Sequence, residues 1–256
     1  MTALSHQFLS APIAHRGLHD KTVGRPENSM AAIMAAVDAG YCIEIDIQRS
    51  KDGQAIVFHD YDLGRLTPEK GSIHLRTADE LTKIRLCDSK ETIPTLGQVL
   101  NAINGHVPLL IEVKDQDGAM GPNTGQLEQA IARDLIDYKG DVAVMSFNPH
   151  SVALLAKLLP NIPRGLVTGS FMEENWGLLP QRIRDELREI PDYETVDASF
   201  ISHRIDDLNR PRVGELKAIG TAVLCWTVRD EVAEETARVV ADNITFEGYI
   251  PKLRSA

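Results

Sequence analysis

Short runs of Val, Ile and Leu alternate along the chain with longer segments whose apolar residues recur every three or four positions. The short runs predict buried strands, and the longer segments predict helices that turn one apolar face to a core. Strands that alternate with helices are typical of α/β proteins with a parallel sheet. The strand candidates lie near residues 12–16, 41–48, 55–59, 107–113, 141–147, 164–168, 194–199, 221–227 and 243–250.

Capping patterns support the helices that the periodicity predicts between these strands. A side chain that accepts a hydrogen bond from the first turn stabilises the start of a helix. The expected caps are Asn28, Thr77, Thr95, Asn148 and Asp230. Thr77 and Thr95 are each followed three residues later by Glu or Gln, which is the capping-box pattern. Pro149 follows Asn148 at the first helical position, where a missing N–H costs nothing.

Nine strand candidates are one more than an eight-stranded barrel holds, although 256 residues suit a barrel of about 250 residues. The turn at 50–54 is much shorter than the dozen or so residues that a parallel crossover needs. Strands 41–48 and 55–59 should therefore pair antiparallel, as a hairpin. We predict an α/β fold, a TIM-type (β/α)8 barrel in which residues 1–256 form a single domain.

The segment 60–94 is longer than a simple loop and contains one capped helix. Long connections of this kind are often functional. We predict a small insertion here, after the His59 strand, that caps the site. A second long loop, 115–124, follows the Glu112 strand, and loops at the carboxyl ends of barrel strands surround the active site.

Acidic side chains interrupt two of the apolar runs. Glu44 and Asp46 alternate with isoleucines and so share one face of a strand, and Glu112 lies in the similar run 109–113. Three hard oxygen ligands suit Mg²⁺ or Ca²⁺ better than zinc, with Mn²⁺ as a further candidate. The sequence predicts one divalent cation at these acids. The alternative is a structural ion pair with a neighbour such as Lys114.

His15 and His59 each end an apolar strand close to these acids. Two imidazoles near neutral pH can divide the general base and general acid roles of one displacement. The histidines without this context are expected at the surface or at helix caps; they are His19, His74, His106, His150 and His203.

Three further residues are candidates for substrate binding. Arg16 and Lys114 could hold a phosphate, the guanidinium by two parallel hydrogen bonds and the ammonium as a point charge. The alternative is that both pair with the nearby acids. Trp226 ends an apolar strand, where it would either line a substrate pocket or pack in the core.

Composition argues against several classes of function. The net charge of −10 without a Lys/Arg block argues against nucleic-acid binding. No apolar run approaches the roughly 18 residues of a membrane span, and no signal-peptide pattern precedes the first strand. Three cysteines without a C-x-x-C pair fit a reducing compartment, so we expect a cytoplasmic protein. The sequence contains no P-loop, dinucleotide-binding or G-x-S-x-G motif, which argues against an ATPase, an NAD-dependent enzyme and a serine hydrolase. A homo-oligomer is compatible with the sequence.

Seven short motifs in order give the chain a resemblance to the glycerophosphodiester phosphodiesterase family, which extends to Trp226. The motifs are His15-Arg16-Gly17, Pro26-Glu27-Asn28-Ser29, Glu44-Ile45-Asp46, Lys51-Asp52-Gly53, His59-Asp60, Ile93-Pro94-Thr95-Leu96 and Glu112-Val113-Lys114. The resemblance implies a TIM-type barrel with a divalent metal held at the three acids. It also implies His15 and His59 as the acid–base pair, and Arg16 and Lys114 at phosphate-binding positions.

The family mechanism implies that one histidine deprotonates the hydroxyl beside the diester and the other protonates the leaving alcohol. A cyclic phosphate forms and water opens it, so glycerophosphodiesters yield glycerol 3-phosphate and an alcohol. Two features depart from the family pattern. Ser29 stands where the family often has Thr. The segment 244–251 stands where the family usually has a Thr-Asp-x-Pro pattern, and this difference alters one wall of the expected pocket.

Two alternatives stay open on the sequence. The same chemistry could act on another small diester, such as a sugar phosphodiester, because the tail at 244–251 and the loop at 115–124 differ from the expected pattern. A barrel that binds a phosphorylated metabolite without cleaving it is the second alternative, although all expected catalytic positions are occupied.

Overall fold

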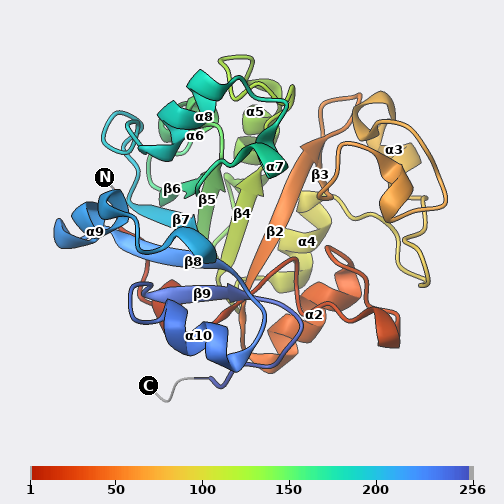
Figure 1. Ribbon diagram of the computed structural model, residues 1–256. Coiled ribbons are helices and arrows are strands. Elements are labelled where there is room, and N and C mark those ends of the chain that lie inside the picture. Colours follow the sequence, from red (N-terminus) through yellow and green to blue (C-terminus); the bar gives the residue numbers. More distant parts are fainter. Residues whose placement is uncertain (1, 254–256) are drawn as a thin grey trace.

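A closed barrel of eight parallel strands forms the centre of the computed structural model, which describes residues 2–253 (Figure 1). The first strand pairs with both the second and the last, which closes the sheet. This confirms the TIM-type (β/α)8 barrel. The barrel strands are β1 (Ile13–Ala14), β2 (Cys42–Arg49), β4 (Leu109–Val113), β5 (Val142–Ser146), β6 (Arg164–Thr168), β7 (Phe200–Arg204), β8 (Ala222–Val228) and β9 (Asn243–Phe246).

The ninth strand, β3 (Ala55–Val57), lies outside the barrel and pairs antiparallel with β2. In its register Ile47 faces Val57 and Arg49 faces Ala55. The short turn at 50–54 therefore forms the predicted hairpin. As a consequence, His59 at the end of β3 and Glu44 on β2 line the same cavity.

Helices follow most of the barrel strands and pack around the outside (Figure 1). The α-helices are α1 (Gln7–Ser10), α2 (Met30–Ala39), α3 (Ala78–Leu81), α4 (Leu96–Ile103), α5 (Gln126–Leu135), α6 (Pro149–Leu158), α7 (Glu173–Trp176), α8 (Gln181–Arg188), α9 (Pro211–Ala218) and α10 (Glu231–Ala237). Short 3-10 helices are η1 (Lys21–Val23), η2 (Leu63–Arg65), η3 (Ile73–Leu75) and η4 (Ile205–Asp207). Within residues 2–253, every helix is too short or too polar to cross a membrane.

Four of the five predicted helix caps are confirmed. Thr77 and Thr95 form capping boxes, and Asn148 and Asp230 accept hydrogen bonds from the first turns of α6 and α10. The prediction for Asn28 was wrong, because Ser29 caps α2. Asn28 adopts φ 58°, in the left-handed region that Asn tolerates, and its side-chain amide donates to Asp46 Oδ2 at 2.9 Å.

The strand predicted at 194–199 was also wrong, since β7 begins at Phe200. Tyr193 and Val196 are buried, but they pack from a turn, and the segment Phe200–Arg204 that follows forms the strand. His203 was expected at the surface and is instead fully buried on β7, where its Nδ1 lies 2.7 Å from Thr168 Oγ1. A buried polar residue with hydrogen-bond partners, such as His203, makes a strand hard to recognise from apolar residues alone.

Two apolar layers result from the alternation of side chains along each strand. Outward-facing residues, such as Ile43, Ile45 and Ile47 on β2, pack against the surrounding helices. Inward-facing residues such as Cys42 and Leu110 fill the amino-terminal half of the barrel, where Phe8 of α1 joins them. The carboxyl-terminal half of the interior is left to Glu44, Asp46 and Glu112, as the period of two predicted.

The segment after β3 has an apolar cluster of its own beside the hairpin. Its buried residues are Ile56, Phe58, Leu63, Leu66, Ile73, Leu81, Leu86 and Ile93. Figure 1 shows this segment, with α3, on the outer side of β3. The segment is therefore packed structure, and its role as a cap over the site stays a prediction.

Candidate active site

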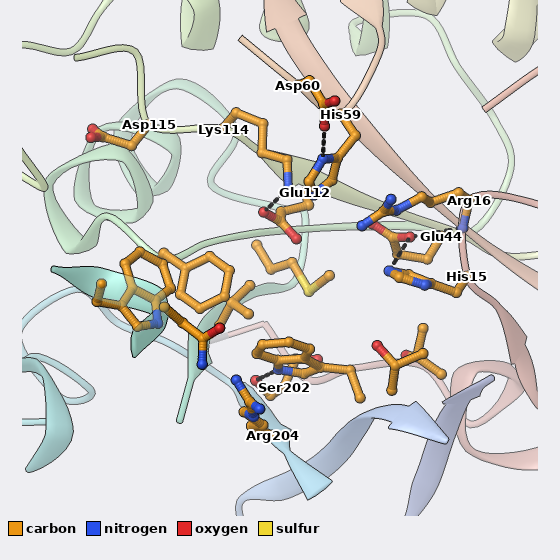
Figure 2. A pocket seen from close by; sticks show the side chains of 18 of the residues that line it. His15, Arg16, Glu44, His59, Asp60, Glu112, Lys114, Asp115, Ser202 and Arg204 are labelled. Atoms are coloured by element: carbon orange, nitrogen blue, oxygen red, sulfur yellow. Dashed lines mark hydrogen bonds and ion pairs between the residues drawn. The ribbon is translucent and has the colours of Figure 1, made fainter. Parts of the chain in front are cut away.

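A cavity of about 580 Å³ opens at the carboxyl ends of the barrel strands. Seven of the eight residues singled out in the sequence line it, namely His15, Arg16, Glu44, His59, Glu112, Lys114 and Trp226. Asp46, the eighth, is buried directly beside Glu44 and Glu112. Figure 2 shows the histidines and acids gathered on one side of this cavity, with Ser202 and Arg204 across from them.

The three predicted metal ligands form one compact cluster. One carboxylate oxygen of each of Glu44, Asp46 and Glu112 lies within 4.8 Å of the others. The parallel register produces this proximity, because Asp46 on β2 faces Glu112 on β4. All three acids are buried, so their charges are poorly screened by water.

Two cations already contact this cluster. Lys114 Nζ lies 2.7 Å from Asp46 Oδ1 and 2.6 Å from Glu112 Oε1, and Arg16 Nε lies 3.2 Å from Asp46 Oδ2. The alternative of ion pairs between these groups is therefore realised for two of the acids. It does not extend to Glu44, whose Oε1 is buried without a hydrogen-bond partner among the described residues.

The electrostatics of Glu44 show that the cluster fits a divalent cation. Burial, together with the negative charges of Asp46 and Glu112, raises the pKa of Glu44 well above its usual value of 4.5. A third negative charge is thus unfavourable here, even with Lys114 and Arg16 in place, unless a further cation binds. An unpartnered carboxylate oxygen beside two more carboxylates is a suitable set of ligands for Mg²⁺, Ca²⁺ or Mn²⁺.

His15 lies next to this cluster at the end of β1. Its Nε2 is 3.9 Å from Glu44 Oε2, and its Nδ1 is 2.6 Å from Glu247 Oε2. Burial lowers the pKa of His15, with the bond to Glu247 acting in the opposite direction. The turn that follows is tight: Gly17 has φ 78°, and a Cβ there would meet the Ala32 backbone at 2.8 Å.

His59 has a similar arrangement on the other side of the acids. Its Nδ1 is 2.6 Å from Asp60 Oδ1. A carboxylate only accepts hydrogen bonds, so Nδ1 donates and Nε2 is the nitrogen left for chemistry. Burial alone would raise the pKa of Asp60, but hydrogen bonds from His59 and Arg65 hold it below its usual range.

Several residues of the site were not recognised as such in the sequence. Asn28 and Glu27 belong to a quoted motif, but they were interpreted only as the approach to a helix. Glu247 was seen only as part of an altered tail, yet it contacts His15, and His19 Nε2 lies 3.6 Å from the same carboxylate rather than at an unrelated surface. For Asn28 and Glu27, their place in the ordered motifs was the available signal of a role in the site. Glu247 had no such signal, because its contact with His15 joins distant parts of the chain.

An aromatic wall faces the acids across the cavity. Phe147, Trp176 and Trp226 line it, with ring centroids 4.9 Å apart for Phe147 and Trp176 and 5.6 Å apart for Phe147 and Trp226. Trp226 also donates from Nε1 to the Ser202 carbonyl and packs against the barrel interior. Both interpretations of Trp226 therefore hold, since it lines the pocket and contributes to packing.

A protein-family model gives the decisive comparison. The Glycerophosphoryl diester phosphodiesterase family matches residues 15–245, which include the histidines, the acids and the aromatic wall. The chain belongs to the glycerophosphoryl diester phosphodiesterase family. It is accordingly an enzyme that hydrolyses phosphoric diesters.

Individual relatives of this phosphodiesterase cover most of its length. The Bacillus subtilis protein YhdW is 29% identical over 86% of each chain. A glycerophosphodiester phosphodiesterase of Caldanaerobacter subterraneus subsp. tengcongensis is 32% identical over 64% of this chain and 69% of its own. A solved phosphodiesterase from Oleispira antarctica, in complex with the product sn-glycerol-3-phosphate, is 26% identical, covers 95% of both chains and has a TM-score of 0.76.

Proposed function

We propose that this phosphodiesterase hydrolyses glycerophosphodiesters to glycerol 3-phosphate and an alcohol, with a divalent cation held by Glu44, Asp46 and Glu112. The observation that carries the proposal is the pair of histidines beside one acidic cluster, each with Nδ1 at 2.6 Å from a carboxylate. This leaves Nε2 of both rings for proton transfer. The solved Oleispira antarctica relative, with its bound product, supports the choice of substrate.

His15 and His59 divide the proton transfers in the proposed mechanism. One ring accepts the proton of the glycerol hydroxyl next to the diester, and that oxygen attacks phosphorus. The other ring donates a proton to the alcohol that leaves, which gives a cyclic phosphate. Water then opens the ring, with the two histidines exchanging roles.

Arg16 and Lys114 bind the phosphoryl group in this proposal. Both line the cavity and both already carry full charge, since the neighbouring carboxylates raise the pKa of each although burial alone would lower it. Fixed cations aimed at developing negative charge lower the barrier without reorganising. A divalent cation at the three acids would add Lewis-acid stabilisation of the phosphoryl oxygens.

The test is release of glycerol 3-phosphate from glycerophosphocholine and glycerophosphoethanolamine by EDTA-treated protein, with and without Mg²⁺, Ca²⁺ or Mn²⁺. Release that returns with metal supports the proposal. Release that EDTA leaves unchanged contradicts the metal requirement. A matched substrate that lacks the attacking hydroxyl separates mechanisms, because its hydrolysis at the normal rate contradicts the cyclic phosphate.

A sugar phosphodiester is the second candidate substrate. Arg204 and Arg229 line the cavity together with Asn175 and the aromatic wall, so a larger polar alcohol has hydrogen-bond donors within reach. Turnover of a sugar diester with both glycerophosphodiesters inert would favour it. Binding of glycerol 3-phosphate by a chain that cleaves no diester would instead favour a binding barrel.

The remaining parts of the proposal concern place and partners. We infer a cytoplasmic location from the free thiols of Cys42, Cys87 and Cys225, which fit a reducing compartment. The substrate is a small molecule, and the acidic chain gives no broad basic surface for nucleic acid. Cell fractionation and sedimentation would test the location and a homo-oligomeric state.

A further inference from the structure

Arg65 lies in the inserted segment 60–94, outside the barrel, yet it contacts Glu27 and Asp60, which themselves contact residues of the proposed site. It ends the short helix η2, which Asp62 caps through the Gly64 amide. Leu63 and Leu66, on either side of it in the chain, are buried in the apolar cluster of the segment. Packing of these neighbours holds the Arg65 backbone, and its side chain reaches toward the barrel.

All three nitrogens of the Arg65 guanidinium are engaged by two carboxylates. Nη1 and Nη2 donate to Glu27 Oε2 and Oε1 at 2.9 and 2.8 Å. Nε and Nη2 donate to Asp60 Oδ2 and Oδ1 at 2.5 and 2.9 Å. Two such paired contacts from one side chain need the planar fork of arginine, and a lysine could not reproduce them.

Each of these carboxylates holds one proposed active-site residue. Glu27 Oε1 accepts from Arg16 Nη1 at 2.6 Å, and Asp60 Oδ1 lies 2.6 Å from His59 Nδ1. A continuous chain of hydrogen bonds thus runs from Arg16 through Glu27, Arg65 and Asp60 to His59. Figure 2 shows the last of these contacts, between Asp60 and His59, at the rim of the cavity.

We propose that Arg65 is a positioning residue that sets His59 and Arg16 relative to each other through Asp60 and Glu27. This inference rests on the proposed roles of His59 and Arg16. The inserted segment then contributes to the reaction, because its fold places the Arg65 guanidinium where it orients the acid–base residue His59 relative to the phosphate-binding residue Arg16.

The partial exposure of Arg65 means that its effect on catalysis can be larger than its effect on the stability of the fold. Its side chain is 44% exposed, so water screens its ion pairs in part, although Glu27 is buried and its pair with Arg65 contributes to folding. Reaction rates are far more sensitive to geometry, since a displacement of about 1 Å can cost on the order of 100-fold. Loss of Arg65 should therefore affect turnover much more than it affects folding.

The test compares Arg65→Met and Arg65→Lys with the matched control Arg76→Met. Arg76 lies in the same segment, and among residues 2–253 its side chain forms its one ion pair with exposed Glu69, at 3.3 Å. We expect Arg65→Met to lower kcat/KM for glycerophosphocholine by about 10- to 100-fold, Arg65→Lys to recover little, and Arg76→Met to match the wild type. Both Arg65 variants should still unfold cooperatively, at a midpoint lowered by the loss of the pair with buried Glu27, whereas Arg76→Met should unfold like the wild type. Equal activity of Arg65→Met and wild type would overturn the proposal.

Two further measurements keep the inference testable whatever the substrate. Guanidinium ion added to Arg65→Ala should restore part of the activity, which a purely structural defect would not allow. Ring-nitrogen NMR signals of His59, identified by their loss in His59→Gln, should show one tautomer in the wild type and a mixture in Arg65→Met. This readout needs no turnover, so inactivity toward glycerophosphocholine would count against the proposed function alone. Identical His59 signals in both proteins would overturn the role of Arg65.

Discussion

His15 Nδ1 lies 2.6 Å from Glu247 Oε2, a contact between residues 232 positions apart. It exists because β1 and β9 are neighbours at the closure of the barrel. Glu247 is itself held from the other side, where Arg229 Nε donates to Oε1 at 2.9 Å. The carboxylate accepts from Nδ1, so it selects the tautomer of His15 and leaves Nε2 on the side of Glu44.

Replacing Glu247 should therefore impair the chemistry more than substrate binding. We expect Glu247→Gln to lower kcat by about 10- to 100-fold, because the amide can also donate to Nδ1 and stabilise the other tautomer. KM should change little. Steady-state kinetics with Glu235→Gln, an exposed residue of α10, provide the control. An unchanged kcat in Glu247→Gln would contradict the orienting role.

Glu44 should control both metal binding and the pH dependence of the metal-free protein. Its folded pKa is raised above 4.5 by burial and by Asp46 and Glu112. The metal-free folded state therefore holds this proton more tightly than the unfolded state, and stability falls as the pH rises from about 4.5 through the folded pKa.

The substitution Glu44→Gln removes this penalty and one ligand. Above the folded pKa we expect the metal-free thermal midpoint to rise by about 2–4 °C and the activity to be lost. Calorimetry with EDTA, and then with Mg²⁺, Ca²⁺ or Mn²⁺, checks both effects. A variant that metal stabilises as strongly as the wild type would exclude Glu44 as a ligand.

Acid should weaken the network around Glu27 in a defined window. Burial alone would raise the pKa of Glu27, but the hydrogen bonds and charges of Arg65 and Arg16 lower it to about 2. A depressed folded pKa stabilises the protein above the unfolded value near 4.5, and this contribution is lost as the pH falls toward 2.

Denaturant unfolding at several pH values measures this contribution, which amounts to about 3 kcal/mol at most. We expect the unfolding free energy of Glu27→Gln to depend less steeply on pH between about 4.5 and 2 than that of the wild type. Glu235→Gln serves as control, because Glu235 is exposed on α10. The same slope in the Glu27 variant and the wild type would contradict the assignment.

The aromatic wall should act on substrate affinity. Trp176 lines the cavity from α7 and lies beside Phe147. Truncation in Trp176→Ala removes contact area that ground state and transition state share, so we expect KM to rise by about 3- to 10-fold with kcat nearly unchanged. Leu178→Ala, two residues away and 99% exposed, is the control. A fall in kcat at constant KM would instead connect Trp176 with the chemical step.

Local patterns carried much of the prediction. The alternation around Glu44 and Asp46 placed both carboxylates inside the barrel, because a strand turns successive side chains to opposite faces. The short turn at 50–54 identified β3 as a hairpin arm, because no parallel crossover fits that length. Each of these inferences depends only on residues close together in the chain.

Failures occurred where tertiary contacts changed the meaning of a residue. The strand β7 was missed because its second half is polar: Ser202 lines the cavity, and His203, on the opposite face, is buried with its ring nitrogens near Thr168 Oγ1 and the Asp207 carbonyl. Asn28 was interpreted as a helix cap because nothing nearby in the chain indicates that Asp46 lies 2.9 Å from its amide.

The sequence by itself determined the barrel, the inward-facing acids and the two histidines at strand ends, because backbone periodicity and turn length are local properties. Only the tertiary structure decided the partner of His15 and the residue that holds Asp60, the partner of His59. Glu247 reaches His15 through barrel closure, and Arg65 reaches Asp60 and Glu27 through the packing of the inserted segment. Such partners depend on where distant parts of the chain meet, and hydrogen-bond geometry at the 3 Å scale has no signature in a linear pattern.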